Sequence, residues 1–192
     1  AFTVNASVAD SFQPGPLMQT GRALDVAVQG AGWIAVETPN GEAYTRAGAF
    51  QVTADGQLQT PSGNAILGDG GPIAIPPDNR VTIATDGTVS VVPLFGTPNN
   101  SNPVGRIKLV NPPENDLARG PDGLFRLKSG QPADADPNVR VVPETLEGSN
   151  VNSVDAMVSL ISLARQFEMQ VKMLQTADTN ARSAGQILSM NR

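Results

Sequence analysis

Residues 152–188 read NSVDAMVSLISLARQFEMQVKMLQTADTNARSAGQIL and form the longest uninterrupted helical pattern in the chain. With Met157 at position a of a heptad, every a and d position is apolar or alanine except Asp178 and Gly185. The apolar positions are Met157, Leu160, Ala164, Phe167, Val171, Leu174, Ala181 and Leu188. We call this set the seam. A seam of this kind needs a partner helix, so it is the predicted assembly interface.

The start and the length of this helix can also be read from the sequence. Asn152 is the predicted N-cap, and Asp155 three residues later resembles a capping box. At about 1.5 Å per residue the helix would be roughly 50 Å long. A domain made from the preceding residues would be narrower than that. We therefore expect at least half of the seam to remain free for a partner in a coiled coil.

The rest of the chain has the pattern of short antiparallel strands. Turn-forming Asn-Gly and Asp-Gly dipeptides lie at 40–41, 55–56, 69–70, 86–87 and 122–123. The strand-like segments are 24–28, 33–36, 43–45, 49–52, 57–59, 65–67, 73–75, 81–84, 88–92, 104–110, 124–127 and 139–142. The predicted class is mainly β, with an antiparallel sandwich or barrel-like body and a long C-terminal amphipathic α-helix. The predicted domains are an extended arm (1–16), a β-rich body (17–145), and a linker with the axial helix (146–192).

Composition excludes several classes of function. The 192 residues contain no cysteine and no histidine, which removes thiolate and imidazole metal sites, thiol nucleophiles and histidine-based triads. A net charge of −5 gives no basic surface for nucleic acid or for an anionic membrane. No apolar run approaches the length of a membrane span. We expect no metal, cofactor, small-molecule substrate, nucleic-acid partner or membrane insertion.

The remaining candidate sites favour structural interpretations. The segment 30–32 (Gly-Ala-Gly) is followed by a strand pattern rather than a helix, so it is predicted to be a hairpin or a tight corner rather than a phosphate loop. The segment 134–136 (Asp-Ala-Asp) is predicted to be a solvated loop. Carboxylates at Asp25, Asp55, Asp86 and Asp122 could supply an acid–base pair, but most of them precede a turn glycine. The protein is therefore predicted not to be an enzyme.

Arg46 and two aromatic residues form the most specific cluster. The Arg46 guanidinium can clamp a carboxylate such as Asp25 and hold a neighbouring loop. Trp33, the sole tryptophan, is expected in the core. A different function remains open, namely a carbohydrate- or surface-binding β module on an oligomerising helical stalk. With one tryptophan and one tyrosine, Tyr44, the chain has little to stack on sugars.

Several of these segments together resemble the flagellar basal-body rod and hook protein family. They are TGRALDVAV at 20–28, GAGW at 30–33, YTRAGAF at 44–50, GQL at 56–58, DG at 86–87 and EGSNVN at 147–152. Within the family, Trp33 and the segment 164–170 are most similar to the proximal rod members. On this resemblance the predicted structural motif residues are Asp25, Trp33, Tyr44, Arg46, Asn150 and Asn152.

The resemblance implies a structural protein of the bacterial flagellar rod, which crosses the periplasm, transmits torque and performs no chemistry. It implies that the C-terminal helix pairs with an N-terminal helix of the full-length chain inside the axial tube, with the β body outside. That N-terminal helix is not seen in the sequence, which starts at Ala1, so we expect a truncated start. Other implied partners are neighbouring rod proteins and copies of the chain itself. Export through the flagellar type III secretion apparatus is also implied.

Overall fold

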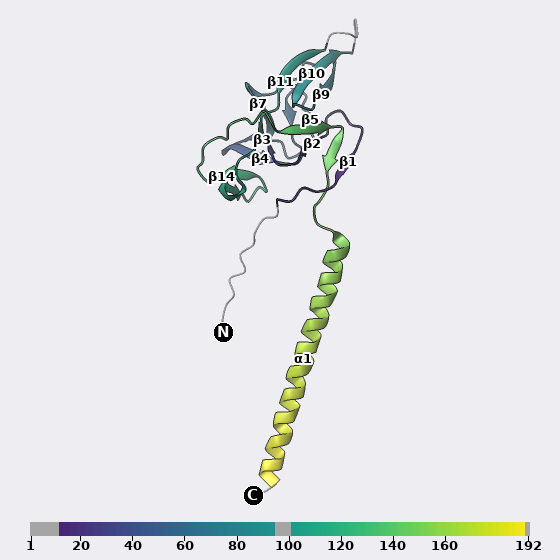
Figure 1. Cartoon of the computed structure of the whole chain (residues 1–192), viewed down its shortest axis with the longest axis vertical. Coiled ribbons are helices and arrows are strands. Elements are labelled where there is room, and N and C mark those ends of the chain that lie inside the picture. Colours follow the sequence, from purple (N-terminus) through teal and green to yellow (C-terminus); the bar gives the residue numbers. More distant parts are fainter. Residues whose placement is uncertain (1–11, 95–100, 191–192) are drawn as a thin grey trace. The chain divides into compact units, whose positions relative to one another are not determined.

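The computed structural model describes residues 12–94 and 101–190, and within the C-terminal helix it describes the side chains of residues 154–180 and of Arg182. The chain divides into two compact units, Ala1–Asn150 and Val151–Arg192. The first unit is the β body and the second contains the helix (Figure 1). The predicted arm 1–16 lies mostly outside the described residues.

Short strands separated by tight turns make up the β body. They are β1 (Leu17–Gln19), β2 (Val26–Gln29), β3 (Trp33–Thr38), β4 (Gly41–Thr45), β5 (Gln51–Val52), β6 (Leu58–Gln59), β7 (Ala65–Gly68), β8 (Gly71–Pro72), β9 (Asn79–Ile83), β10 (Thr88–Pro93), β11 (Asn102–Arg106), β12 (Leu109–Val110), β13 (Leu117–Arg119), β14 (Phe125–Leu127), β15 (Arg140–Pro143) and β16 (Thr145–Glu147). One 3-10 turn, η1 (Glu114–Asp116), precedes β13. Gly56 and Gly87 have positive φ in two of the predicted turns, as hairpin geometry requires.

In the described part of the chain the strands form four antiparallel sheets. The largest has the order β13-β14-β4-β3-β7-β6-β5, with β12 added to β3 and β8 added to β7. A second sheet has the order β11-β10-β9, and two strand pairs, β15-β2 and β1-β16, complete the set. None of these sheets closes on itself. The predicted class, an antiparallel β body with a long C-terminal helix, is therefore confirmed, without a closed barrel.

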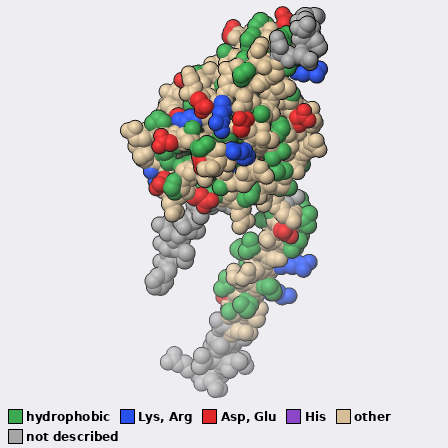
Figure 2. Space-filling view, turned by 45° about the horizontal axis from the view of Figure 1, so that its top comes forward, with side chains coloured by type: hydrophobic (Ala, Val, Ile, Leu, Met, Phe, Trp, Pro, Cys, Tyr) green, Lys and Arg blue, Asp and Glu red, His purple; other side chains and the backbone are tan. Residues whose placement is uncertain are grey.

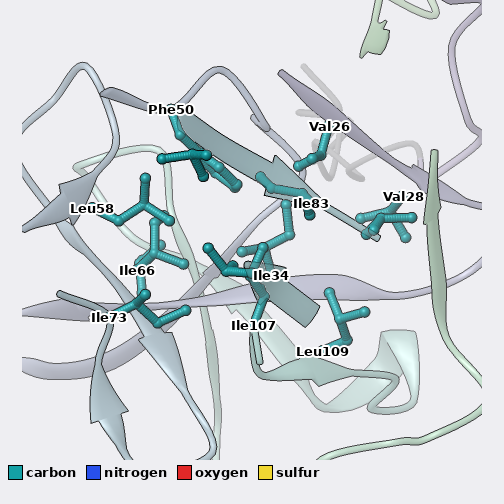
Figure 3. Packing of buried hydrophobic residues seen from close by; sticks show 14 of the residues in the cluster. Val26, Val28, Ile34, Phe50, Leu58, Ile66, Ile73, Ile83, Ile107 and Leu109 are labelled. Atoms are coloured by element: carbon teal, nitrogen blue, oxygen red, sulfur yellow. The ribbon is translucent and has the colours of Figure 1, made fainter. Parts of the chain in front are cut away.

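One hydrophobic core holds most of these sheets together. Its buried residues come from the nine-stranded sheet, the three-stranded sheet, the pair β15-β2 and the segments beside them, and they include Ile34, Phe50, Leu58 and Ile66, none of which has exposed surface. Figure 3 shows such side chains, from β2, β3, β7, β9 and the neighbouring segments, pointing toward one another. Burying each large aliphatic side chain contributes roughly 1.5–3 kcal/mol, so this cluster supplies the main stabilisation of the body.

A second, smaller cluster is aromatic. Trp33, 7% exposed, lies with its ring centroid 4.7 Å from that of Phe125 and 5.9 Å from that of Phe12. Edge-on and tilted contacts of this kind are the preferred geometry for aromatic pairs. The expectation that Trp33 belongs to the core is confirmed.

The helix α1 runs over Ser153–Met190. The predicted bounds, 152–188, are thus correct to within two residues at either end. Its interior contains no proline, and its single glycine, Gly185, lies near the C-terminal end.

Three features of the body differ from the strand pattern. The segment 73–75 forms only an isolated bridge, at Ala74, instead of a strand. The strands β1, β8, β13 and β16 were not predicted, and β16 lies at the boundary between the predicted body and the predicted linker. The segment 30–32 is a corner and not a hairpin, because β2 pairs with β15 while β3 pairs with β4, β7 and β12. The unpredicted strands β1, β13 and β16 have three residues each and β8 has two, too few for an alternating pattern to stand out.

Candidate assembly surface

The N-terminus of α1 is capped as the sequence predicts. The side-chain Oδ1 of Asn152 accepts a hydrogen bond of 3.0 Å from the backbone N–H of Val154. The Asn152 carbonyl accepts the first intrahelical bond, 3.0 Å from the N–H of Ala156. Asp155 lies in the first turn, where a negative charge interacts favourably with the helix dipole.

The described seam residues of α1 present apolar surface to solvent. Met157, Leu160, Phe167 and Leu174 are each more than 60% exposed, Ala164 is exposed, and Val171 is partly exposed. Figure 2 shows apolar side chains along the described part of the helix. Ala181 and Leu188 belong to the predicted seam, but their side chains lie outside the described residues.

Apolar exposure on α1 extends beyond the seam. Val154, Val158 and Ile161 widen it, as the sequence indicates. Leu163, Met169 and Met173 are also exposed, and in the same heptad register they occupy positions g, f and c. Their apolar character is visible in the sequence, but an interpretation based on one a/d seam leaves them out.

Within the β body, Arg46 is the centre of a dense set of hydrogen bonds. It directly follows β4, and its Nε donates to Oε2 of Glu147 at 2.8 Å while its Nη2 donates to Oε1 of the same side chain at 3.2 Å. The same guanidinium donates to the carbonyl oxygens of Gly32 and Gly30 at 3.0 Å and of Val28 at 3.5 Å. Its Cζ also lies 5.9 Å from the centroid of Trp33. Both charged side chains are largely buried, with 17% exposure for Arg46 and 9% for Glu147.

The carboxylate that binds Arg46 is therefore Glu147 and not Asp25, which the sequence suggested. Asp25 is buried and bonds to Arg22 Nη1 at 2.7 Å and to the Thr20 hydroxyl at 2.8 Å. Arg22 lies three residues from Asp25 and was the nearer basic partner in sequence. By contrast, no local signal could have connected Arg46 with a residue 101 positions away.

Residues 13–20 run alongside residues 144–150 through a continuous set of bonds. β1 pairs antiparallel with β16, so that Leu17 faces Glu147 and Gln19 faces Thr145. Beyond the strands, the N–H of Thr20 donates to the carbonyl of Glu144 and that of Gly148 donates to the carbonyl of Pro16, both at 2.8 Å. Two side chains add to this set, as the Gly15 N–H donates to Oε1 of Glu147 and Nδ2 of Asn150 donates to the carbonyl of Gln13, also at 2.8 Å. The two segments therefore approach and leave the body side by side.

Tyr44 is the remaining predicted motif residue, and it is 1% exposed. Its hydroxyl accepts a hydrogen bond of 2.7 Å from the backbone N–H of Ala133. Burial raises the pKa of Tyr44 to about 12, because the phenolate would lose its hydration. The ring thus anchors the segment around Ala133 to β4.

Three of the four candidate acid–base carboxylates, Asp25, Asp86 and Asp122, make structural contacts. Asp86 accepts bonds from the backbone and hydroxyl of Thr88, which lower its pKa. Arg126 binds Asp122 and brings the pKa of that carboxyl down to about 2. Among the described residues no group of three metal-ligating side chains is close enough to hold an ion. No described helix is both long and apolar enough to cross a bilayer.

Two family models match the chain. Residues 27–91 match the "Flagellar hook protein FlgE/F/G D1 domain", and residues 142–187 match the "Flagellar basal body rod FlgEFG protein C-terminal" region. The first range contains Arg46 and most of the large sheet. The second contains Glu147, the cap Asn152 and the described seam.

Curated proteins with similar sequences have matching names. The flagellar basal-body rod protein FlgF of Escherichia coli strain K12 is 47% identical over 185 residues, which are 93% of this chain and 73% of that protein. FlgF of Salmonella typhimurium is 46% identical over the same shares of the two chains. The flagellar basal-body rod protein FlgG of Agrobacterium fabrum is 35% identical over 92% of this chain and 69% of that protein. With such identity over nearly its whole length, the chain belongs to the flagellar basal-body rod protein family.

Proposed function

We propose that this protein is a structural component of the proximal part of the bacterial flagellar rod, where it assembles with other axial proteins and transmits torque. The observation that carries the proposal is the capped helix α1, whose exposed apolar side chains lie in the region matched by the rod C-terminal model. Exposed apolar surface of this extent is typical of protein–protein interfaces. The same proposal includes a rod position that crosses the periplasm and export through the flagellar type III apparatus, and membership of the rod family supports both.

The proposed partners of the seam are helices of the same family. They include copies of this chain, neighbouring rod proteins and an N-terminal helix of the full-length chain. The pairing of β1 with β16 supports the last of these, because it brings the N-terminal approach of the body next to the segment that leads to α1. Contacts between copies that do not close into a ring produce helical assemblies.

The alternative function, a carbohydrate-binding β module on a helical stalk, would need exposed aromatic rings on which sugars could stack. Trp33 and Tyr44 are both buried, and the Trp33 ring is occupied by Phe12, Phe125 and Arg46. An enzymatic function has equally little support, since Asp25, Asp86 and Asp122 each have a structural partner.

A pair of matched substitutions on α1 tests the proposed function. Phe167→Gln removes an exposed apolar side chain from the seam, and Met169→Gln removes one of similar exposure from the opposite position f. Each variant is expressed in the native host in place of the normal chain, and purified basal bodies are probed for it. We expect Phe167→Gln to reduce incorporation and swimming, and Met169→Gln to have a smaller effect. Absence of the normal protein from basal bodies, or equal and normal incorporation of both variants, would overturn the proposal.

A further inference from the structure

The pair of strands β1 and β16 needs support from outside itself. The two strands have three residues each and form a sheet of their own, with no third strand paired to either in the described residues. An isolated two-stranded pair is marginally stable in water. Two of the three residues of β1, Leu17 and Met18, are about half exposed, so apolar burial on this strand contributes little.

Arg46 gives support of this kind through Glu147. Both oxygens of the Glu147 carboxylate face the guanidinium, in the bidentate geometry that gives charge-assisted bonds their strength. Oε1 also accepts the backbone N–H of Gly15, two residues before β1, so one side chain of β16 joins both segments, 13–20 and 144–150, to Arg46. If one partner is removed, the charge of the other remains unpaired in a largely buried site. Removing either partner alone is therefore strongly destabilising.

The other donors of Arg46 fix it to the rigid part of the body. Its bonds to the carbonyls of Gly30 and Gly32 hold the corner between β2 and β3, and both of these strands contribute residues to the main core. The backbone at Gly15 lies directly against the backbone of Gly148. A Cβ on Gly15 would lie 1.9 Å from the carbonyl oxygen of Gly148. The contact thus joins residues of the two matched regions, 27–91 and 142–187.

We propose that Arg46 and Glu147 form a latch that holds β1 and β16 on the body and fixes where the chain leaves it toward α1. Opening the latch releases residues 13–20 and 144–150 together as one local unit, while the hydrophobic core stays folded. Arg46 and Glu147 are positioning residues in this scheme. Its consequence for the rod, that load from the axial helix enters the body through β16, rests on the proposed function, but the latch itself does not.

A second ion pair in the body provides a matched control. Lys108 Nζ bonds to both carboxylate oxygens of Glu42, at 2.8 and 2.9 Å, and the side chains have exposures of 18% and 13%. This pair resembles the latch in burial and geometry but joins β4 to the residue before β12. If ion pairs in this body act only through global stability, breaking either one has the same effect on β1 and β16.

The test is amide hydrogen exchange of the whole chain, read by peptide in Glu147→Gln, Arg46→Lys and Glu42→Gln. Arg46→Lys keeps the charge but loses the fork of donors. In the two latch variants we expect exchange in 15–20 and 144–149 to accelerate by about ten- to a hundredfold, with β3 and β7 unchanged. Glu42→Gln leaves 15–20 and 144–149 at the normal rate. Equal acceleration in all three variants, acceleration throughout the body, or no change in either latch variant would overturn the latch.

The rod is tested separately from the latch. If the exchange result is as expected and Glu147→Gln cells also swim poorly with normal protein levels, both the latch and its role in carrying load are supported. If exchange is as expected but swimming is normal, the load-bearing role is overturned and the local latch stands. Equal and normal incorporation of Phe167→Gln and Met169→Gln overturns the proposed function, whatever the exchange experiment gives.

Discussion

At the scale of single residues, the buried Tyr44 hydroxyl shows how one polar group can hold a long segment. It accepts the N–H of Ala133, 89 positions along the chain, at a site with almost no solvent. A neutral phenol suits this site, and a phenolate does not, because desolvation disfavours the charged form. The folded chain therefore holds its tyrosine proton to higher pH than the unfolded chain does.

This difference in proton affinity makes stability depend on alkaline pH. The pKa of Tyr44 rises from 10.0 to about 12 on folding, so its contribution is complete below about pH 10 and is lost as pH rises toward 12. We expect the free energy of unfolding to fall by up to roughly 2 kcal/mol more in the normal chain than in Tyr44→Phe over this window. Urea unfolding followed by Trp33 fluorescence measures it. Tyr44 is the only tyrosine, so tyrosinate absorbance titrates it directly, and a midpoint near 10 would contradict the expectation.

Gly48 is a second residue whose identity is dictated by a close approach. A Cβ at this position would lie 1.8 Å from the carbonyl oxygen of Val26, and the Gly48 carbonyl accepts the Val26 N–H at 2.9 Å. We expect Gly48→Ala to destabilise the body by about 1–3 kcal/mol, because the backbone must move to admit the methyl group. Gly70→Ala is the control, because nothing lies within 4 Å of that Cβ. Equal urea midpoints for the two variants would show that the approach is not tight.

At the scale of elements, α1 depends on its first turn more than a packed helix would. Its described apolar side chains are largely exposed, so tertiary contacts within the described residues add little to local helix propensity. The Asn152 cap satisfies a backbone donor that would otherwise lack an intrahelical partner.

We expect Asn152→Ala to lower the stability of the helix by about 1 kcal/mol and to reduce helical ellipticity. Asn152→Asp keeps an acceptor at the cap and should keep the ellipticity. Far-UV circular dichroism is a sensitive measure, because the 38-residue α1 is the single α-helix of the described chain. The same ellipticity and melting curve for Asn152→Ala as for the normal chain would argue against a capping role.

At the scale of the whole molecule, the two units have different sources of stability. Both hydrophobic clusters are built from the β body, and neither includes a described residue of α1. Two units without a shared core do not unfold as one two-state system.

We therefore expect two separate thermal transitions at low protein concentration. Trp33 fluorescence should report a cooperative transition of the body, and helical ellipticity should decline over a broader range that begins at lower temperature. Raising the concentration should shift the helical transition upward if the seam self-associates, and should leave the Trp33 transition in place. Coincident transitions at low concentration would show that the units stabilise each other.

Local chemistry made much of this protein readable from sequence. The helix, its Asn152 cap and the exposed seam follow from a period of 3.6 residues and a capping side chain, both of which act within a few positions. The β class follows from Asp-Gly and Asn-Gly turns, and the burial of Trp33 from its size and apolar character.

Pairing across the chain was decided only by the tertiary structure. The pattern around 30–32 fits a hairpin as well as a corner, and only the ladders with β15 and β4 show that it is a corner. Arg46 could have reached several carboxylates, and the pairing of β1 with β16 places Glu147 beside it instead of Asp25. Strands of two to four residues carry too little pattern to select their own partners. Which strands pair depends on how the side chains of all the strands pack together in one core. That packing is a property of the whole fold.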